Sequence, residues 1–236
     1  VAGRNWRNLI VLGMLGVFVL GNALFHWEAA RGGHAAQGYG LRRGLGAGVM
    51  MIAVIGGRIV PSFTRNWLVR RRAGRLPAAP MQAFDKLSLL ALLAALMAWV
   101  AAPLHPVSGL ALLLAGLLHL ARIARWAGDR TLAEPLVTVL HAGYAFVPLG
   151  ALALGAEILV PGRLGMAGAQ HLWMAGAIGL MTLAVMTRAT LGHTGQELHA
   201  GVGTLAIFAA LVLAVLARVG AGIWAGQAAG LHGAAG

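Results

Sequence analysis

The sequence predicts an all-α protein, a polytopic bundle of about seven transmembrane helices with its N-terminus in the cytoplasm. The first observation is composition: 59% of the 236 residues are hydrophobic, 10% are charged, and the mean hydropathy is +0.80. Soluble domains carry about 25% charged residues, so this chain has too few charges to cover a water-facing surface. The second observation is that the apolar residues gather in blocks long enough to cross a bilayer.

The third observation is where the charge lies. A net charge of +12 would suit a nucleic-acid-binding protein, but the basic residues stand between apolar blocks, a pattern typical of cytoplasmic loops. These features exclude an ordinary soluble domain, a disordered chain and a nucleic-acid-binding module. The chain has no cysteine, which excludes disulfides, thiolate metal sites, iron–sulfur clusters and haem attached through Cys-x-x-Cys-His. Any haem or metal must be held by histidine or methionine.

The predicted spans follow from the rule that a spanning helix needs about 20 mostly apolar residues. They are residues 8–25, 45–63, 87–103, 107–126, 136–160, 171–188 and 202–219. The third and fourth are joined by a tight hairpin at residues 103–106. The fifth is long and contains Pro148, so we expect a tilt or a kink there. The 35 glycines suit membrane helices, which use small residues to approach one another closely.

Orientation follows from the arginines and lysines in alternate loops. Twelve fall on the side of the N-terminus and five on the other side. The five are Arg31, Arg42, Arg43, Arg163 and Arg218. We therefore predict a cytoplasmic N-terminus, with residues 64–88 as the main cytoplasmic loop.

Arg58 is the first candidate site residue, because ionisable groups inside spans are costly and often functional. It lies between Gly56-Gly57 and Pro61, and Pro61 has no N–H to bond the carbonyl of Gly57. We interpret the segment as a broken helix holding a buried cation, suited to an anionic ligand such as a haem propionate. The alternative is an arginine whose side chain reaches the cytoplasmic interface.

The sixth predicted span carries polar and sulfur-bearing residues at helical spacing: His171, Met174, Ile178, Met181, Val185 and Arg188. At 3.6 residues per turn they form one stripe. Imidazole and thioether are ligands for haem or copper, although methionines at this spacing are also ordinary packing residues. The imidazole is the firmer candidate, because in a membrane it needs a hydrogen-bond or metal partner.

Two more histidines lie inside spans. His141 shares a helix face with Tyr144 and Pro148, where a kink opens room for a ligand or serves packing alone. His119 shares a face with Arg122, an arrangement that suits a haem iron and its propionate.

The topology places the candidate residues in two groups. His119 and His141 fall in the cytoplasmic half of the bundle, as do Arg58 and Arg188. His171 falls near the outer face with His26, His34 and His105. Two groups indicate two metal sites, or one site plus interfacial histidines. Acidic residues are few, and Asp85 is among those assigned to the cytoplasmic side, so a carboxylate-driven proton pump is not expected.

Four motifs carry a resemblance to a known family. They are residues 55–66 (Ile-Gly-Gly-Arg-Ile-Val-Pro-Ser-Phe-Thr-Arg-Asn), 140–150, 176–195 with His171 just before it, and 5–8 (Asn-Trp-Arg-Asn). Together they resemble the signatures of the NnrS family. Members are bacterial inner-membrane proteins of about twelve helices, described as containing haem and copper and tied to nitric oxide stress and denitrification.

The resemblance implies cofactors and the residues that hold them. The cofactors are non-covalent, b-type-like haem and copper. The implied metal ligands are His141, His171 and His193, and the wider cofactor site adds Arg58, Arg188 and, as a weaker match, His119. The family's N-terminal half, with its Trp-His-x-His-Glu-Met-type motif, is missing, and its last helix is missing or degraded into residues 220–236. We therefore expect residues 1–236 to be a single transmembrane domain and a fragment of a larger protein.

The leading functional hypothesis is a haem and copper protein of the inner membrane that protects against nitric oxide. Its expected partners are the lipid bilayer and nitric oxide or a related small molecule, and not nucleic acid. Both binding and turnover of nitric oxide are compatible with this hypothesis. One alternative is a transporter for an anion or metal ion that uses the broken helix around Arg58. Another is a respiratory-type electron-transfer subunit with two stacked haems.

Overall fold

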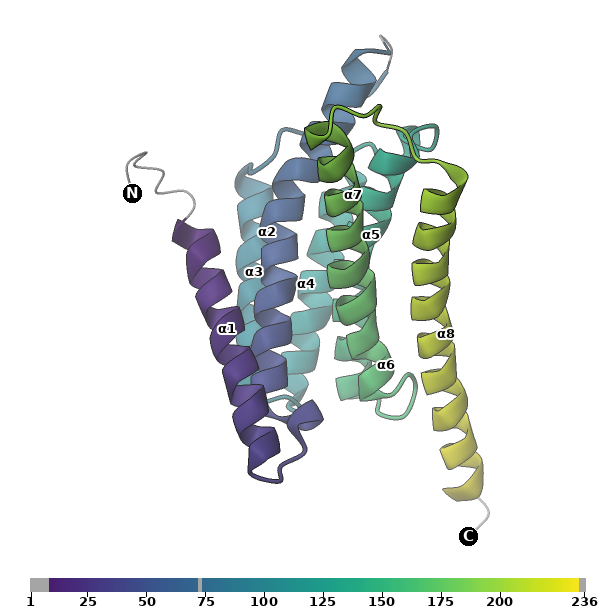
Figure 1. The fold of residues 1–236 in the computed structure, drawn as a ribbon. Helices are drawn as coiled ribbons and strands as arrows, with labels where there is room; N and C mark the ends of the chain where they lie inside the picture. Colours follow the sequence, from purple (N-terminus) through teal and green to yellow (C-terminus); the bar gives the residue numbers. More distant parts are fainter. Residues whose placement is uncertain (1–8, 72–73, 234–236) are drawn as a thin grey trace.

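The structure, a computed structural model, describes residues 9–71 and 74–233, with side-chain environments up to Trp224. Seven helical spans in this part are long and apolar enough to cross a membrane, which confirms the predicted fold class (Figure 1). They are α1 (Leu9–Ala30), α2 (Tyr39–Val69), α3 (Ala83–Ala101), α4 (Pro106–Ala124), α5 (Pro135–Leu159), a sixth span of α6 (Met166–His171), η4 (Leu172–Leu180) and α7 (Met181–His193), and α8 (Val202–Gly233). Two short 3₁₀ turns, η2 (Ala35–Gln37) and η3 (Gly128–Arg130), lie between spans.

Most helices extend beyond the predicted spans at one end or both, whereas α3, α4 and α5 each end one or two residues before the predicted end. α2 is the clearest case, because it begins at Tyr39 and ends at Val69, which reduces the predicted loop 64–88 to residues 70–82. α8 continues past residue 219 to Gly233. The residues that α2 adds include Arg42, Arg43 and Arg65, and because arginine is a good helix former, α2 continues where hydropathy has fallen. Arg4, Arg7, Arg72 and the motif at residues 5–8 lie outside the described residues.

Local signals determine where two of the helices begin. Gln82 and Asp85 form a capping box at the start of α3, in which each side chain bonds the other residue's backbone N–H. α4 starts with Pro106, and the Nδ1 atom of His105 accepts a hydrogen bond of 3.2 Å from the N–H of Val107. Proline suits the first helical position because that N–H has no helical partner. These caps produce the predicted hairpin between α3 and α4.

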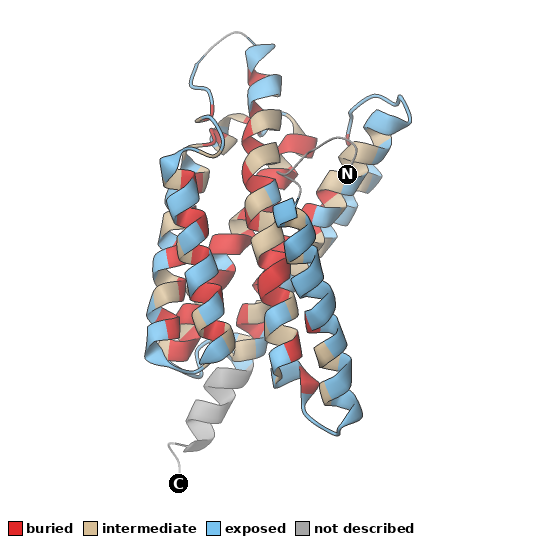
Figure 2. Ribbon diagram, turned by 90° about the vertical axis from the view of Figure 1, so that its left-hand side faces the viewer, coloured by how far each residue is buried: buried red, intermediate tan, exposed pale blue. Residues whose placement is uncertain are grey.

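α5 is the central helix. It packs against α4, α2 and the three parts of the sixth span, and most of its residues are buried. Close contact with α4 depends on glycine: a Cβ atom on Gly155 would lie 2.7 Å from the carbonyl oxygen of Gly109. α1 and α8 are peripheral, and Gly21 is the single buried residue of α1. Figure 2 shows buried positions inside the bundle and exposed outward faces, as a membrane span requires.

The sixth span is not a uniform α-helix. Its central nine residues, Leu172–Leu180, form a π-helix, whose i→i+5 hydrogen bonds rotate one end of the span relative to the other. The predicted single stripe from His171 to Arg188 is therefore wrong. Met174 is 41% exposed and Met181 is 2% exposed, so the two thioethers do not share a face.

Candidate functional site

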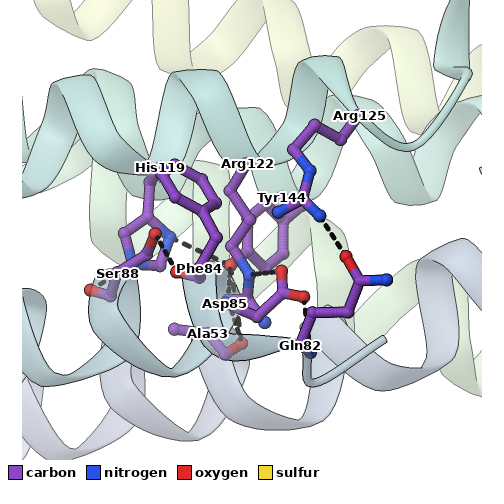
Figure 3. A network of polar contacts seen from close by, with 9 residues as sticks. All are labelled: Ala53, Gln82, Phe84, Asp85, Ser88, His119, Arg122, Arg125 and Tyr144. Carbon is purple, nitrogen blue, oxygen red and sulfur yellow. Dashed lines mark hydrogen bonds and ion pairs between the residues drawn. The ribbon is translucent and has the colours of Figure 1, made fainter. Parts of the chain in front are cut away.

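A network of buried polar groups joins α3, α4 and α5 (Figure 3). Its centre is an ion pair in which Arg122 Nε donates to Asp85 Oδ1 at 2.8 Å, with both side chains at most 2% exposed. The second carboxylate oxygen, Oδ2, accepts from the backbone N–H of Gln82 at 3.0 Å. A buried charge is tolerated when it is paired and hydrogen-bonded, although Arg122 Nη2 has no hydrogen-bond partner within the described residues. The pair thus ties the start of α3 to the end of α4.

Arg122 also reaches Tyr144 on α5. Its Nη1 donates to the Tyr144 hydroxyl at 2.6 Å and to the carbonyl of Ala53 at 3.1 Å. The hydroxyl is in turn 3.0 Å from His119 Nδ1, and His119 Nε2 is 3.1 Å from the Ser88 carbonyl. Since a carbonyl only accepts, His119 donates through Nε2 and accepts from Tyr144 at Nδ1. In this arrangement neither ring nitrogen of His119 has a lone pair free for a metal.

Two glycines of α2 make room for this network. A Cβ atom on Gly57 would overlap the Arg122 Nη2 atom, and a Cβ on Gly56 would lie 2.9 Å from the Tyr144 ring. α2 nevertheless runs unbroken through Pro61, so the predicted break around Arg58 is wrong. The glycine pair serves close packing, and the transporter alternative loses the feature that favoured it.

Arg58 and Arg188 are not among the residues that form the hydrogen bonds around Arg122. Both are half-buried, and neither forms an ion pair among the residues that the structure describes. The Arg188 guanidinium stacks 4.5 Å above the ring of Phe63 on α2, a cation–π contact. Their charges are therefore not neutralised by a carboxylate contact.

His141 has one ring nitrogen bonded and one free. Thr64 donates its hydroxyl proton to the Val60 carbonyl at 2.8 Å, and its oxygen lies 2.7 Å from His141 Nε2. His141 must therefore donate through Nε2, which leaves a lone pair on Nδ1. This Nδ1 is buried and has no hydrogen-bond partner within residues 9–71 and 74–224. Gly128 covers it: a Cβ there would lie 2.6 Å from the nitrogen.

The other two predicted metal ligands, His171 and His193, are less buried than His141. His171 is half-buried, donates from Nδ1 to the Ala167 carbonyl at 2.8 Å and accepts from Arg218 Nε at 3.3 Å. His193 is exposed at the end of α7. His171 and His193 stand at opposite ends of the sixth span, on the order of 30 Å apart at about 1.5 Å per residue, so they cannot bind one metal ion. No group of three or more His, Asp or Glu residues suited to a metal occurs in the described part of the chain.

Sequence reasoning missed most of the polar network. Asp85 was assigned to the cytoplasmic side, and Ser88 and Thr64 carried no prediction. One available signal was the hairpin itself. Three contacting pairs lie at equal sequence distances from a point between residues 103 and 104: Gln82 with Arg125, Asp85 with Arg122, and Ser88 with His119. A tight helical hairpin places such pairs at the same depth.

Comparison with known proteins gives one match. A family model described as NnrS protein matches residues 1–236. No curated protein and no solved structure matches the chain.

Proposed function

Because the chain belongs to the NnrS family and has seven spans able to cross a membrane, we propose that it is a bacterial inner-membrane protein that binds haem and copper. The proposed role is in nitric oxide stress or denitrification. Family membership supports the cofactors, and the structure offers one observation that bears on where they bind. That observation is the free Nδ1 lone pair of His141.

His141 fits the requirements of a metal ligand. A ligating imidazole usually donates its other N–H to a neighbouring acceptor, which fixes the ring and its tautomer, and Thr64 supplies that acceptor. A buried nitrogen without a hydrogen-bond partner is costly, and coordination to a metal would remove that cost. In the same region His119 fits less well, because both of its nitrogens are already bonded.

The surrounding residues define what the chain contributes. A bound haem iron supplies a site for nitric oxide. His141 would hold that iron, Thr64 would orient the imidazole ring, and the buried Trp126, whose ring centroid is 6.4 Å from that of His141, would exclude water. Arg58 and Arg188 would provide cations for the haem propionates. Because Gly128 covers Nδ1, the turn η3 must move aside for a ligand to reach the nitrogen.

The test is the optical spectrum and the iron and copper content of the purified protein. A Soret band with stoichiometric metal is expected for the wild type, a strong loss for His141→Ala, and a shifted spectrum for Thr64→Val. His34→Ala, at an exposed position in the loop before α2, is the matched control and retains the band. A wild-type protein without a Soret band or metal would overturn the proposal, and an unchanged His141→Ala spectrum would remove His141 from it.

Binding and turnover of nitric oxide are separated by a second measurement. If the protein only sequesters the gas, an electrode records uptake that saturates near one molecule per haem. If it is an enzyme, consumption continues as long as an electron donor is present. The small number of acidic residues in the chain gives few proton carriers for a reductase and favours sequestration.

A further inference from the structure

A groove of about 700 Å³ runs between α1, α2 and α3. α1 meets α2 closely at two places: a Cβ on Gly40 would lie 2.2 Å from the backbone nitrogen of Phe25, and at the crossing with Gly44 a Cβ on Gly21 would lie 2.5 Å from the backbone nitrogen of Gly44. From that crossing towards its N-terminus, α1 leans away from the bundle (Figure 1). The walls are mainly apolar and include Met14, Val17, Leu96 and Met97.

One end of the groove is cationic. Tyr39 and Arg43 line it there, and the guanidinium carbons of Arg42 and Arg43 lie 4.8 and 5.6 Å from the Tyr39 ring centroid. Within the described chain Arg43 has no carboxylate partner. The nearby Glu28 carboxylate is already engaged, since it accepts hydrogen bonds from the backbone N–H groups of Tyr39 and Gly40.

The dimensions of the groove match one leaflet of a bilayer. On α2 its lining extends from Tyr39 to Met50, which is about 16 Å of helix at 1.5 Å per residue. Half of the hydrocarbon thickness of a bilayer is about 15 Å. The volume lies within the range of small-molecule sites, roughly 300–1,000 Å³. A cationic entrance with an apolar trough of this depth is complementary to an amphiphile with an anionic head.

We propose that this groove binds one anionic phospholipid, with its phosphate held by Arg43 and an acyl chain lying between α1, α2 and α3. Charge selects the occupant: a zwitterionic lipid carries its own cation, and an apolar helix of a second copy leaves Arg43 without a counter-ion. None of the residues named for the cofactor lines the groove. The proposal is therefore independent of the haem and copper assignment.

Native mass spectrometry tests the headgroup. The protein is released from micelles that contain equimolar phosphatidylglycerol and phosphatidylcholine with identical acyl chains. The wild type is expected to retain one phosphatidylglycerol in preference. Arg43→Gln lowers the ratio of the two retained lipids about fivefold, the factor for the roughly 1 kcal/mol that one arginine contributes near anionic lipid. Arg163→Gln, which removes an exposed charge elsewhere on the same side, is the control and keeps the ratio.

A second pair of variants tests the apolar part of the groove. Gly13 lines the groove and Gly16 does not, and a Cβ at either position meets no atom within 4 Å. Gly13→Leu fills the groove and is expected to reduce retained lipid several-fold, while Gly16→Leu retains it. No preference in the wild type, an equal loss in Arg43→Gln and Arg163→Gln, or full retention in Gly13→Leu overturns the proposal. A dimer that Gly13→Leu abolishes would assign the groove to a second copy instead.

Discussion

Asp85 and Arg122 form a fully buried ion pair 2.8 Å long, and they stand at equal sequence distances from the hairpin that joins their helices. The hairpin therefore brings together the one acid of α3 and a base of α4 at a shared depth in the bundle. The same pair connects to α5 through Tyr144 and to α2 through Ala53. Four helices thus meet at a single guanidinium.

Neutralising Asp85 tests the contribution of the pair. Asp85→Asn leaves the Arg122 charge buried and uncompensated, and the expected loss is about 3–5 kcal/mol of unfolding free energy. The measurement is unfolding in mixed micelles. Replacing both partners by apolar residues, as Asp85→Leu with Arg122→Met, should recover most of the loss. Glu197→Gln, at an exposed position, is the neutral control, and an equally stable Asp85→Asn would contradict the prediction.

Adding a methyl group at Gly57 tests why α2 carries two adjacent glycines. The new Cβ would overlap Arg122 Nη2, and three bonded partners prevent the guanidinium from moving aside freely. Gly57→Ala should therefore lower stability by about 1–3 kcal/mol, the usual cost of overpacking. Gly16→Ala, in open space on α1, should be neutral or slightly stabilising because alanine is the better helix former. Equal stabilities for the two variants would count against close packing as the reason.

Removing the Tyr144 hydroxyl separates Arg122 from His119. Tyr144→Phe leaves His119 Nδ1 without its donor, and a buried polar group without a partner costs about 1–3 kcal/mol. Tyr39→Phe is the matched control, because Tyr39 is 46% exposed. Unfolding measurements should show a loss in the first variant alone. A loss of the same size in both would indicate a general effect of the substitution.

Trp173 tests the contact between the π-helical segment and α5. Its indole N–H donates to the Val147 carbonyl at 2.9 Å, and its ring packs edge-on against Trp99 at 5.7 Å. Trp173→Phe removes the donor and part of the packing, so we expect a loss of about 1–3 kcal/mol. Trp224→Phe, at a residue that is 77% exposed, should change stability little. If Trp173→Phe also leaves stability unchanged, the hydrogen bond from Trp173 to Val147 does not anchor the π-helical segment.

Much of the fold could be predicted from the sequence, because a membrane span needs a long apolar stretch and this chain has seven of them. The hairpin at residues 103–106 was equally predictable from its two prolines. The helix ends were not predictable from the sequence, because hydropathy falls before the backbone stops being helical. α2 shows this between residues 63 and 69. The predicted break at Pro61 was wrong, because α2 continues through this proline to Val69.

The candidate site was less predictable. His119 and His141 look alike as buried histidines in neighbouring spans, yet Tyr144 and Ser88 occupy both nitrogens of the first and Thr64 occupies one nitrogen of the second. Those partners come from helices distant in sequence, and spacing along one helix cannot reveal them. The assignments of His141, His171 and His193 as metal ligands stay predictions.

The π-helical segment of the sixth span, Leu172–Leu180, determines how far the two ends of the span are rotated relative to each other. α6 packs against α8, where Arg218 contacts His171, while α7 presents Arg188 to Phe63 on α2. Deleting one residue within Leu172–Leu180 would turn one end by about 100° relative to the other. Either His171 would then face away from Arg218, or Arg188 would face away from Phe63. The π-helical segment thus sets the direction in which a single span presents His171 to α8 at one end and Arg188 to α2 at the other.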